Sequence, residues 1–209
     1  MSNLENCTTI PEVIEIYESV DGDDEFNTEV VYRIAEIIAE EDDDINDSLE
    51  YRNIMIGATD YCDSLVVEIQ EAIEALDEAY NAEEWDQMTY DAFADWESDE
   101  AMADAAEEVK DVNVLLAEFK GYMHDMGESV AGLYGSDFDF GFSDSLNEAF
   151  FGDFWGSEMN MDKIVQARGQ MLLLLENIGG LDVTFTENLE NTEDEIQERV
   201  DEEWQKFSA

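Results

Sequence analysis

Apolar residues recur at steps of three and four along most of the chain, and this spacing places them on one face of an α-helix. The clearest case is Tyr61–Asn81, where acidic residues occupy the positions between the apolar ones. At about 100° per residue, these acids fall on the opposite face. The pattern predicts an amphipathic helix that displays a row of carboxylates. Its apolar face consists of Cys62, Leu65, Ile69, Ala72, Ile73, Leu76 and Tyr80.

Similar spacing predicts helices on both sides of this one. The first begins at Thr9, because Pro11 suits a first helical turn and Glu12 completes a capping box with Thr9. The last begins at Thr192, where Glu195 completes a second capping box. The other predicted helices start near Thr28 and span Asp47–Ala58, Trp85–Trp96, Met102–Met123 and Met161–Ile178.

Glycine-rich positions interrupt this helical pattern in two places. The helix over Met161–Ile178 is expected to end at Gly179 and Gly180, and the residues up to Phe185 then alternate as in one short strand. Between 127 and 156, glycines alternate with aromatic residues, which predicts irregular structure. The inward residues expected of the first helix and of Met161–Ile178 are Val13, Ile14, Tyr17, Val20, Ile164, Val165, Met171, Leu172, Leu175 and Ile178.

These elements together predict a mostly α fold. We expect a single acidic helical domain over residues 1–209, compact or elongated, with about seven to eight helices, the Gly/aromatic irregular segment and one short strand. No internal repeat or linker divides the sequence. The Gly/aromatic segment at 127–156 is therefore the one sub-boundary that the sequence suggests.

The charge balance changes this picture of an ordinary helical protein. The 209 residues include 57 acids and 8 Lys or Arg, for a formal net charge of −49. The 44% apolar and 11% aromatic content is nevertheless that of a folded protein. Asn53–Val109 contains no Lys or Arg and holds eighteen acids, from Asp60 to Glu108. Because such an excess destabilises a compact chain by self-repulsion, solubility alone does not explain it.

Several features of the sequence restrict the location and the partners of the protein. The sequence shows no signal peptide, and its apolar run Met171–Leu175 is too short to cross a membrane. With only Cys7 and Cys62 available for disulfides, we expect a reduced cytoplasmic protein, in the host cell cytoplasm if it is phage-encoded. An acidic surface repels nucleic acid phosphates and anionic lipids. We therefore expect no direct nucleic acid binding, no membrane binding, and a basic protein as partner.

Motifs for catalysis and metal binding are missing from the sequence. His124 is the only histidine and Gly121 stands three residues before it, so the Glu-x-x-His pairs of helical di-metal centres cannot form. The calcium-loop candidates Asp21–Tyr32 and Asp137–Glu148 both carry phenylalanine where the loop requires glycine. Carboxylate pairs of the glycosidase type stay open, because 57 acids offer many pairs. We expect no enzyme, no cofactor and no dedicated metal site.

Three hypotheses account for the charge itself. In the first, the carboxylates imitate nucleic acid phosphates and occupy the basic groove of a partner. Duplex DNA carries one charge per about 1.7 Å, so 49 charges correspond to roughly 80 Å of duplex. Acids one helical turn apart are about 5–6 Å from each other, near the phosphate spacing along one strand. The second hypothesis is adaptation to high salt, and the third is an acidic adaptor or chaperone for basic proteins such as nucleoid proteins or histones.

In composition and charge patterning, with the acids from Asp60 to Glu78 on one helix face, the chain resembles the DNA-mimic proteins of phages and mobile elements. This class includes antirestriction and anti-CRISPR inhibitors. The resemblance implies inhibition of a host defence system such as restriction-modification or CRISPR, and a homodimer as one form of the protein. We expect docking through the acids between Asp60 and Glu108, helped by Glu36–Asp47 and Glu193–Glu203. The predicted partner-binding residues are Asp60, Asp63, Glu68, Glu71, Glu74, Glu78, Glu83, Glu84, Asp86, Asp91, Asp95, Glu97, Asp99, Glu100, Asp104, Glu107 and Glu108.

Overall fold

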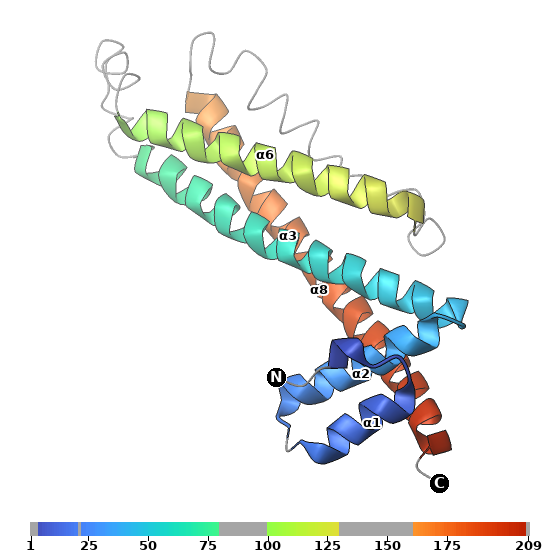
Figure 1. Ribbon diagram of the computed structural model, residues 1–209. Coiled ribbons are helices and arrows are strands. Elements are labelled where there is room, and N and C mark those ends of the chain that lie inside the picture. Colours follow the sequence, from blue (N-terminus) through green and yellow to red (C-terminus); the bar gives the residue numbers. More distant parts are fainter. Residues whose placement is uncertain (1–3, 21, 80–99, 130–160, 208–209) are drawn as a thin grey trace. The chain divides into compact units, whose positions relative to one another are not determined.

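The structure is a computed structural model, and it describes residues 4–20, 22–79, 100–129 and 161–207. In these residues all regular elements are helical, with five α-helices, one short 3-10 helix and no strand (Figure 1). The prediction of a mostly α protein is therefore confirmed. The elements are η1 (Leu4–Asn6), α1 (Ile10–Ser19), α2 (Asp24–Ala39), α3 (Asp43–Ala79), α6 (Glu100–Ser129) and α8 (Met161–Phe207).

The start of α1 follows the capping box that the sequence predicts. The Glu12 carboxylate accepts hydrogen bonds from the backbone N–H groups of Thr8 and Thr9, at 2.9 and 3.1 Å. Pro11 occupies the first turn of the helix. These bonds satisfy N–H groups that a helix start leaves without an intrahelical partner, and they fix the point where α1 begins.

α2 begins earlier than the apolar pattern suggests. Its first residue is Asp24, not a residue near Thr28, because Asp23 is the N-cap. The Asp23 Oδ1 atom accepts a hydrogen bond from the Phe26 backbone N–H at 3.0 Å. Aspartate is among the preferred N-cap residues for this reason. The helix therefore starts inside the rejected calcium-loop candidate Asp21–Tyr32.

α3 joins two helices that the sequence pattern separates. It covers both Asp47–Ala58 and most of Tyr61–Asn81, and ends at Ala79. The buried positions continue at three- and four-residue steps across the expected gap, so one face stays apolar without interruption. A single long helix buries that face without the unpaired backbone groups that two extra helix ends would create. The buried residues around the gap are Met55, Ala58, Cys62 and Leu65.

α8 likewise continues through Gly179 and Gly180, so the predicted helix end is wrong. The predicted short strand is also wrong, because Leu181–Phe185 belongs to this helix. Ile178 and Phe185 are both fully buried and stand seven residues apart, as equivalent positions of successive heptads do. Their burial offsets the cost of glycine in a helix interior, which is about 1 kcal/mol per residue relative to alanine.

The capping box predicted at Thr192 does not form, because Thr192 lies in the interior of α8. Its hydroxyl donates to the Asn188 carbonyl oxygen at 2.8 Å, one turn earlier in the same helix. Thr192 is buried, so this bond satisfies a polar group that would otherwise lose its water partner. Threonine is favoured at helix starts, but it is also accommodated in a helix interior when its hydroxyl donates to the carbonyl oxygen four residues earlier.

The inward face of α8 differs from the prediction within the run Met171–Leu175. Leu174 is buried, whereas Leu172 is 42% exposed and Leu175 is half-buried. A run of consecutive leucines is compatible with any helical phase. The phase is set by Met171 and Ile178, which are both buried and stand three residues before and four residues after Leu174.

Several predicted features lie outside the described residues. They are the helix over Trp85–Trp96, the calcium-loop candidate Asp137–Glu148 and residues 130–156 of the Gly/aromatic segment, whose residues 127–129 belong to α6. The helix expected over Met102–Met123 lies within α6. Among the helices that the structure describes, none combines the length and the hydropathy of a membrane span.

The chain divides into two compact units. Unit 1 comprises Met1–Gly57 and Phe185–Ala209, and unit 2 comprises Ala58–Thr184. α3 and α8 contribute residues to both units.

The core of unit 1 combines η1, α1 and α2 with parts of α3 and α8. Val13 of α1 is buried as predicted, whereas Val20 and Tyr17 are exposed. The Tyr17 ring nevertheless stacks on Phe26 of α2, with centroids 6.4 Å apart, and meets the edge of Trp204 of α8 at 5.2 Å. These contacts tie three helices together. The buried residues are Leu4, Cys7, Ile10, Val13, Phe26, Val30, Ile34, Ala35, Ile38, Ile45, Ile196 and Val200.

Unit 2 is built on a heptad pattern that α3, α6 and α8 share. Buried positions alternate steps of three and four in each helix, which is the repeat of a coiled-coil seam. Tyr61 of α3 contacts Phe119 and Tyr122 of α6, with ring centroids 5.6 and 5.2 Å apart. The buried residues are Ala58, Cys62, Leu65, Ile69, Ala72 and Leu76 of α3, Val109, Val112, Leu116 and Phe119 of α6, and Met171, Leu174 and Ile178 of α8.

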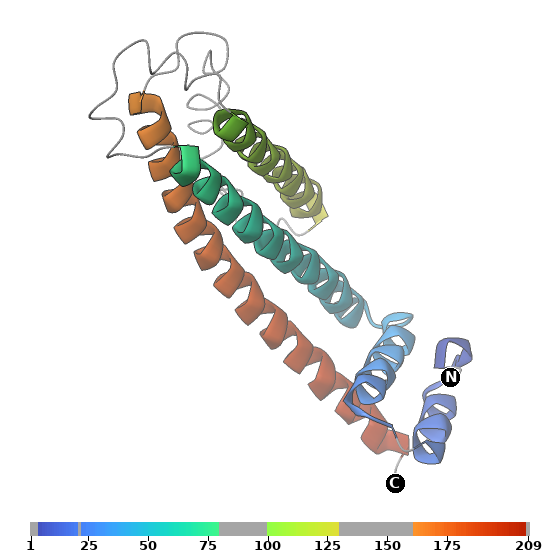
Figure 2. The ribbon, with the colours of Figure 1, turned by 90° about the vertical axis from the view of Figure 1, so that its left-hand side faces the viewer.

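In unit 2, α3 runs antiparallel to both of the helices that it contacts (Figures 1 and 2). The contact of Tyr61 pairs an early part of this segment with the later half of α6, whereas Glu68, further along, lies beside Glu108 in the first half of α6. Near the end of α3, Asp77 forms an ion pair with Arg168 near the start of α8. The interfaces of α3 with α6 and with α8 are called the two seams of α3 below. They bring together residues that are far apart in sequence.

Candidate partner-binding surface

The acids predicted to bind a partner follow the outer face of α3 in unit 2. The heptad pattern buries one side of this helix, so residues between the buried positions face away from it. At a rise of 1.5 Å per residue, the row from the first to the last of these acids is about 27 Å long. Asp60, Asp63, Glu71, Glu74 and Glu78 are exposed, and Glu68 is half-buried.

On α6 the structure places part of the predicted set. Asp104 and Glu107 are exposed, and Glu108 is half-buried. Glu100 is the first residue of α6. The other predicted residues lie outside the described part of the chain, and they are Glu83, Glu84, Asp86, Asp91, Asp95, Glu97 and Asp99.

Three of the predicted acids meet across the seam between α3 and α6. One carboxylate oxygen each of Glu68, Glu71 and Glu108 lies within 4.8 Å of the other two. Burial raises the pKa of Glu108 above its usual range, and the facing carboxylates of Glu71 and Glu68 raise it further. The sequence places these residues on acidic faces, but not in one group. One sequence feature could have predicted this group. Glu68 and Glu108 both stand directly before a buried residue of the heptad pattern.

Carboxylate oxygens are the ligands that hard divalent cations prefer. Glu68, Glu71 and Glu108 therefore have the chemistry and spacing to hold such an ion, although exposed acids adopt this spacing without one. The prediction of no dedicated metal site stays a prediction.

Carboxylates of α3 and α8 also influence each other electrostatically. Asp182 of α8 is half-buried near Asp63 of α3, and burial followed by the charge of Asp63 raises the pKa of Asp182. Burial, with the charges of Asp182 and Asp63 beside it, also raises the pKa of the Cys62 thiol to about 12. Asp182 is absent from the predicted set, because the paired glycines before it indicate a helix end and a strand.

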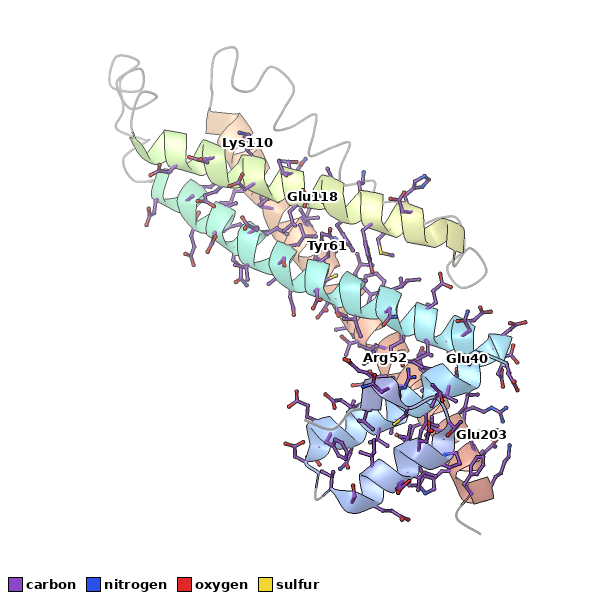
Figure 3. All side chains as sticks on the ribbon, viewed as in Figure 1. Glu40, Arg52, Tyr61, Lys110, Glu118 and Glu203 are labelled. Carbon is purple, nitrogen blue, oxygen red and sulfur yellow. The ribbon has the colours of Figure 1, made fainter. Side chains whose placement is uncertain are left out.

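Basic residues balance little of this charge in the described part of unit 2. Arg168 forms an ion pair with Asp77. Lys110 and Lys120 of α6 form no ion pair with any carboxylate that the structure describes. Figure 3 shows Lys110 and Glu118 on α6, with Tyr61 of α3 between the two ribbons.

Unit 1 uses its basic residues differently. The Arg52 guanidinium of α3 lies 3.8 Å from the centroid of the Tyr32 ring of α2, and its Nε donates to Glu193 Oε1 of α8 at 2.8 Å. The Tyr32 hydroxyl donates to the same oxygen at 2.9 Å. Burial and this hydrogen bond raise the pKa of Tyr32 to about 12. One cation therefore connects three helices through an ion pair and a cation–π contact.

Two other arginines in unit 1 also connect separate elements. Arg33 of α2 donates from Nε to the Cys7 carbonyl oxygen, at 3.1 Å, just after η1. Arg199 of α8 pairs with Asp42, which precedes α3, at 2.8 Å. That hydrogen bond holds the pKa of Asp42 below its usual range. None of these links has a signature in the sequence, because each joins residues that are distant in the chain.

These links also occupy acids of the flanking segments expected to help in docking. Glu36 pairs with Arg33, Asp42 with Arg199, and Glu193 with Arg52. The segments Glu36–Asp47 and Glu193–Glu203 therefore contribute carboxylates to internal ion pairs of unit 1.

The two cysteines are poorly placed to act as nucleophiles. Cys7 and Cys62 are both buried, and they do not form a disulfide. A thiol with a pKa of about 12, as Cys62 has, stays protonated at neutral pH and is a weak nucleophile. His124 is exposed on α6.

Comparison with known proteins found no matching family model, no matching curated protein and no matching solved structure.

Proposed function

We propose that the protein is a DNA mimic that occupies the basic nucleic-acid-binding groove of a partner protein, and that it inhibits a host defence system in this way. The supporting observation is the outer face of α3 in unit 2, where five exposed acids form no ion pair with any described basic residue. In unit 1, by contrast, Arg52 and Arg199 pair with carboxylates of other elements, and Arg33 pairs with Glu36 in the same helix.

The row on α3 has dimensions that suit a groove made for a phosphate backbone. It is about 27 Å long, and its successive acids stand about one helical turn apart. The charges are carried by a helix that a heptad core holds in place, so docking does not require them to be ordered first. Binding of this kind is fast and weakens steeply with salt, because it depends on many exposed charges.

The carboxylates that meet across the seams of unit 2 support the same proposal. Glu68, Glu71 and Glu108 repel one another, so their proximity does not stabilise the fold. A basic partner relieves this repulsion when it binds. Residues that oppose folding but favour binding are common at functional surfaces.

The test is an affinity pull-down from the lysate of a candidate host, with and without competitor duplex DNA. We expect recovery of a nucleic-acid-binding protein that the competitor displaces. Recovery of none defeats the proposal. Recovery of histones or nucleoid proteins that resist DNA competition would favour the acidic adaptor, and unfolding in low salt, followed by circular dichroism, would favour salt adaptation.

Two variants with equal loss of charge test the surface itself. The first is Glu71→Gln, Glu74→Gln and Glu78→Gln on α3. The control is Glu15→Gln, Glu18→Gln and Glu29→Gln, three exposed acids of α1 and α2 that form no described ion pair. We expect the first variant to weaken capture of the partner more than the control does. An equal effect of both would contradict docking through the α3 face.

A further inference from the structure

The charged residues between helices attract one another in unit 1 and repel one another in unit 2. In unit 1, an arginine faces a carboxylate where α3 meets α8, with Arg52 and Glu193 at 2.8 Å. Arg199 and Asp42 form a second such link, also at 2.8 Å. Attraction between opposite charges therefore stabilises these junctions.

In unit 2, carboxylates face carboxylates on both seams of α3. On the seam with α6, Glu68 and Glu71 face Glu108, whose own helix adds the charges of Glu107 and Asp111. On the seam with α8, Asp63 faces Asp182.

One described ion pair opposes this repulsion, between Arg168 of α8 and Asp77 of α3. Lys110 is exposed beside Glu108 in sequence but forms no ion pair with a described carboxylate. Apart from this pair, the described acids on the two seams of α3 in unit 2 lack the arginine partners that acids have at the junction of α3 and α8 in unit 1.

We propose that unit 2 is a pH-responsive helical bundle, whose helices hold together more strongly when the carboxylates on the two seams of α3 are protonated. In unit 1 the carboxylates of Glu193 and Asp42 pair with arginines instead, so we expect a much weaker response there. As the pH falls below neutral, protonation of Glu108 or of Asp182 removes one of the charges that repel each other on these seams. The apolar heptad core then acts without the opposing repulsion. The proposal does not depend on the identity of any partner.

The sign follows from proton binding. Burial and neighbouring acids raise the pKa of Glu108 and of Asp182, so the folded bundle binds protons more readily than the unfolded chain. The stability that this adds is fully present below the usual carboxyl pKa of about 4, and it is lost as the pH rises through the raised values. Asp42 in unit 1 has a lowered pKa and responds in the opposite direction.

Hydrogen exchange followed by mass spectrometry on the full chain resolves the two units. After correction for intrinsic exchange rates, protection of residues 58–78 and 107–125 should be greater at pH 5 than at pH 7. The expected gain is a fewfold, because only part of the stability that is fully present below the usual carboxyl pKa is already present at pH 5. Protection of α2 should change much less. A fall of unit 2 protection between pH 7 and 5 would overturn the proposal.

Matched variants separate the seam from the total charge. Glu108→Gln imitates protonation at the seam, so it should raise protection of unit 2 at pH 7 and reduce its dependence on pH. Glu118→Gln removes the same charge from an exposed position ten residues further along the same helix (Figure 3), and should leave that dependence in place. If both variants behave alike, the response reflects overall charge, and the proposal is wrong.

Discussion

Unit 1 and unit 2 contain equally few basic residues but use them differently. Each unit contains four of the eight Lys and Arg residues. In unit 1 all four form ion pairs, and Arg52 and Arg199 link helices that are distant in sequence. In unit 2 the described pair is Arg168 with Asp77, while the outer face of α3 and two of its seams carry uncompensated acids. The basic residues of this polyanion therefore mark the carboxylates that support the fold.

The cores of the two units differ in a parallel way. Unit 1 packs short capped helices and aromatic rings into a mixed core, with Tyr17 contacting both Phe26 and Trp204. Unit 2 repeats one heptad pattern along three helices. A heptad seam needs apolar residues at only two of seven positions, so it leaves most of the helix surface for other purposes. Unit 2 can therefore carry acids on its outer face without losing its core.

The largest expected effect comes from the core of unit 2. Phe119→Ala removes a fully buried ring of α6 and should destabilise the unit by about 3–5 kcal/mol. Hydrogen exchange should show loss of protection in residues 58–78 and 107–125 before α2. Val114→Ala on the exposed side of the same helix is the control and should cost about 0.5 kcal/mol or less. Equal loss of protection in α2 would show that the two units unfold together.

A smaller effect is expected at the junction of unit 1. Arg52→Gln removes both the cation over Tyr32 and the partner of Glu193, and should cost about 1–3 kcal/mol in urea unfolding. Arg52→Lys keeps the charge but lacks the planar guanidinium, so its stability should lie between that of the unchanged protein and that of Arg52→Gln. If lysine restores full stability, stacking on Tyr32 contributes nothing, and the comparison of the units rests on charge alone.

The smallest effect is expected from Asp42, whose pKa is lowered by Arg199. The stability from this pair is present above the usual carboxyl pKa of about 4 and is lost as the pH falls through the lowered value. Asp42→Asn should therefore make α2 and the start of α3 less sensitive to pH below about 4, measured by hydrogen exchange. Asp47→Asn, at an exposed acid without a described ion pair, is the control. A variant that stays as acid-sensitive as its parent would show that the pair does not govern this response.

Local features of the fold could be predicted because their causes are local. The capping box at Glu12 and the burial of Leu65 and Ile69 follow from residues within one or two turns. The helix end predicted at Gly179 is wrong because glycine only weakens a helix, and packing of Ile178 and Phe185 outweighs that cost.

The candidate surface shows the same division. Its exposed acids on α3, such as Asp60 and Glu74, could be predicted from helical periodicity alone. The meeting of Glu68 and Glu71 with Glu108 could not, because it depends on the register between two helices separated by many residues. The position of Asp182 beside Asp63 could not be predicted for the same reason.

The amino-acid sequence by itself determined the helical character, the apolar faces of most helices and the excess of acids, since composition and spacing act within single elements. The tertiary structure decided where helices end, which leucine of Met171–Leu175 enters the core, and which carboxylates meet an arginine or another carboxylate. These outcomes depend on contacts between distant residues. Packing and charge act through space, and the order of residues along the chain does not specify which of them become neighbours.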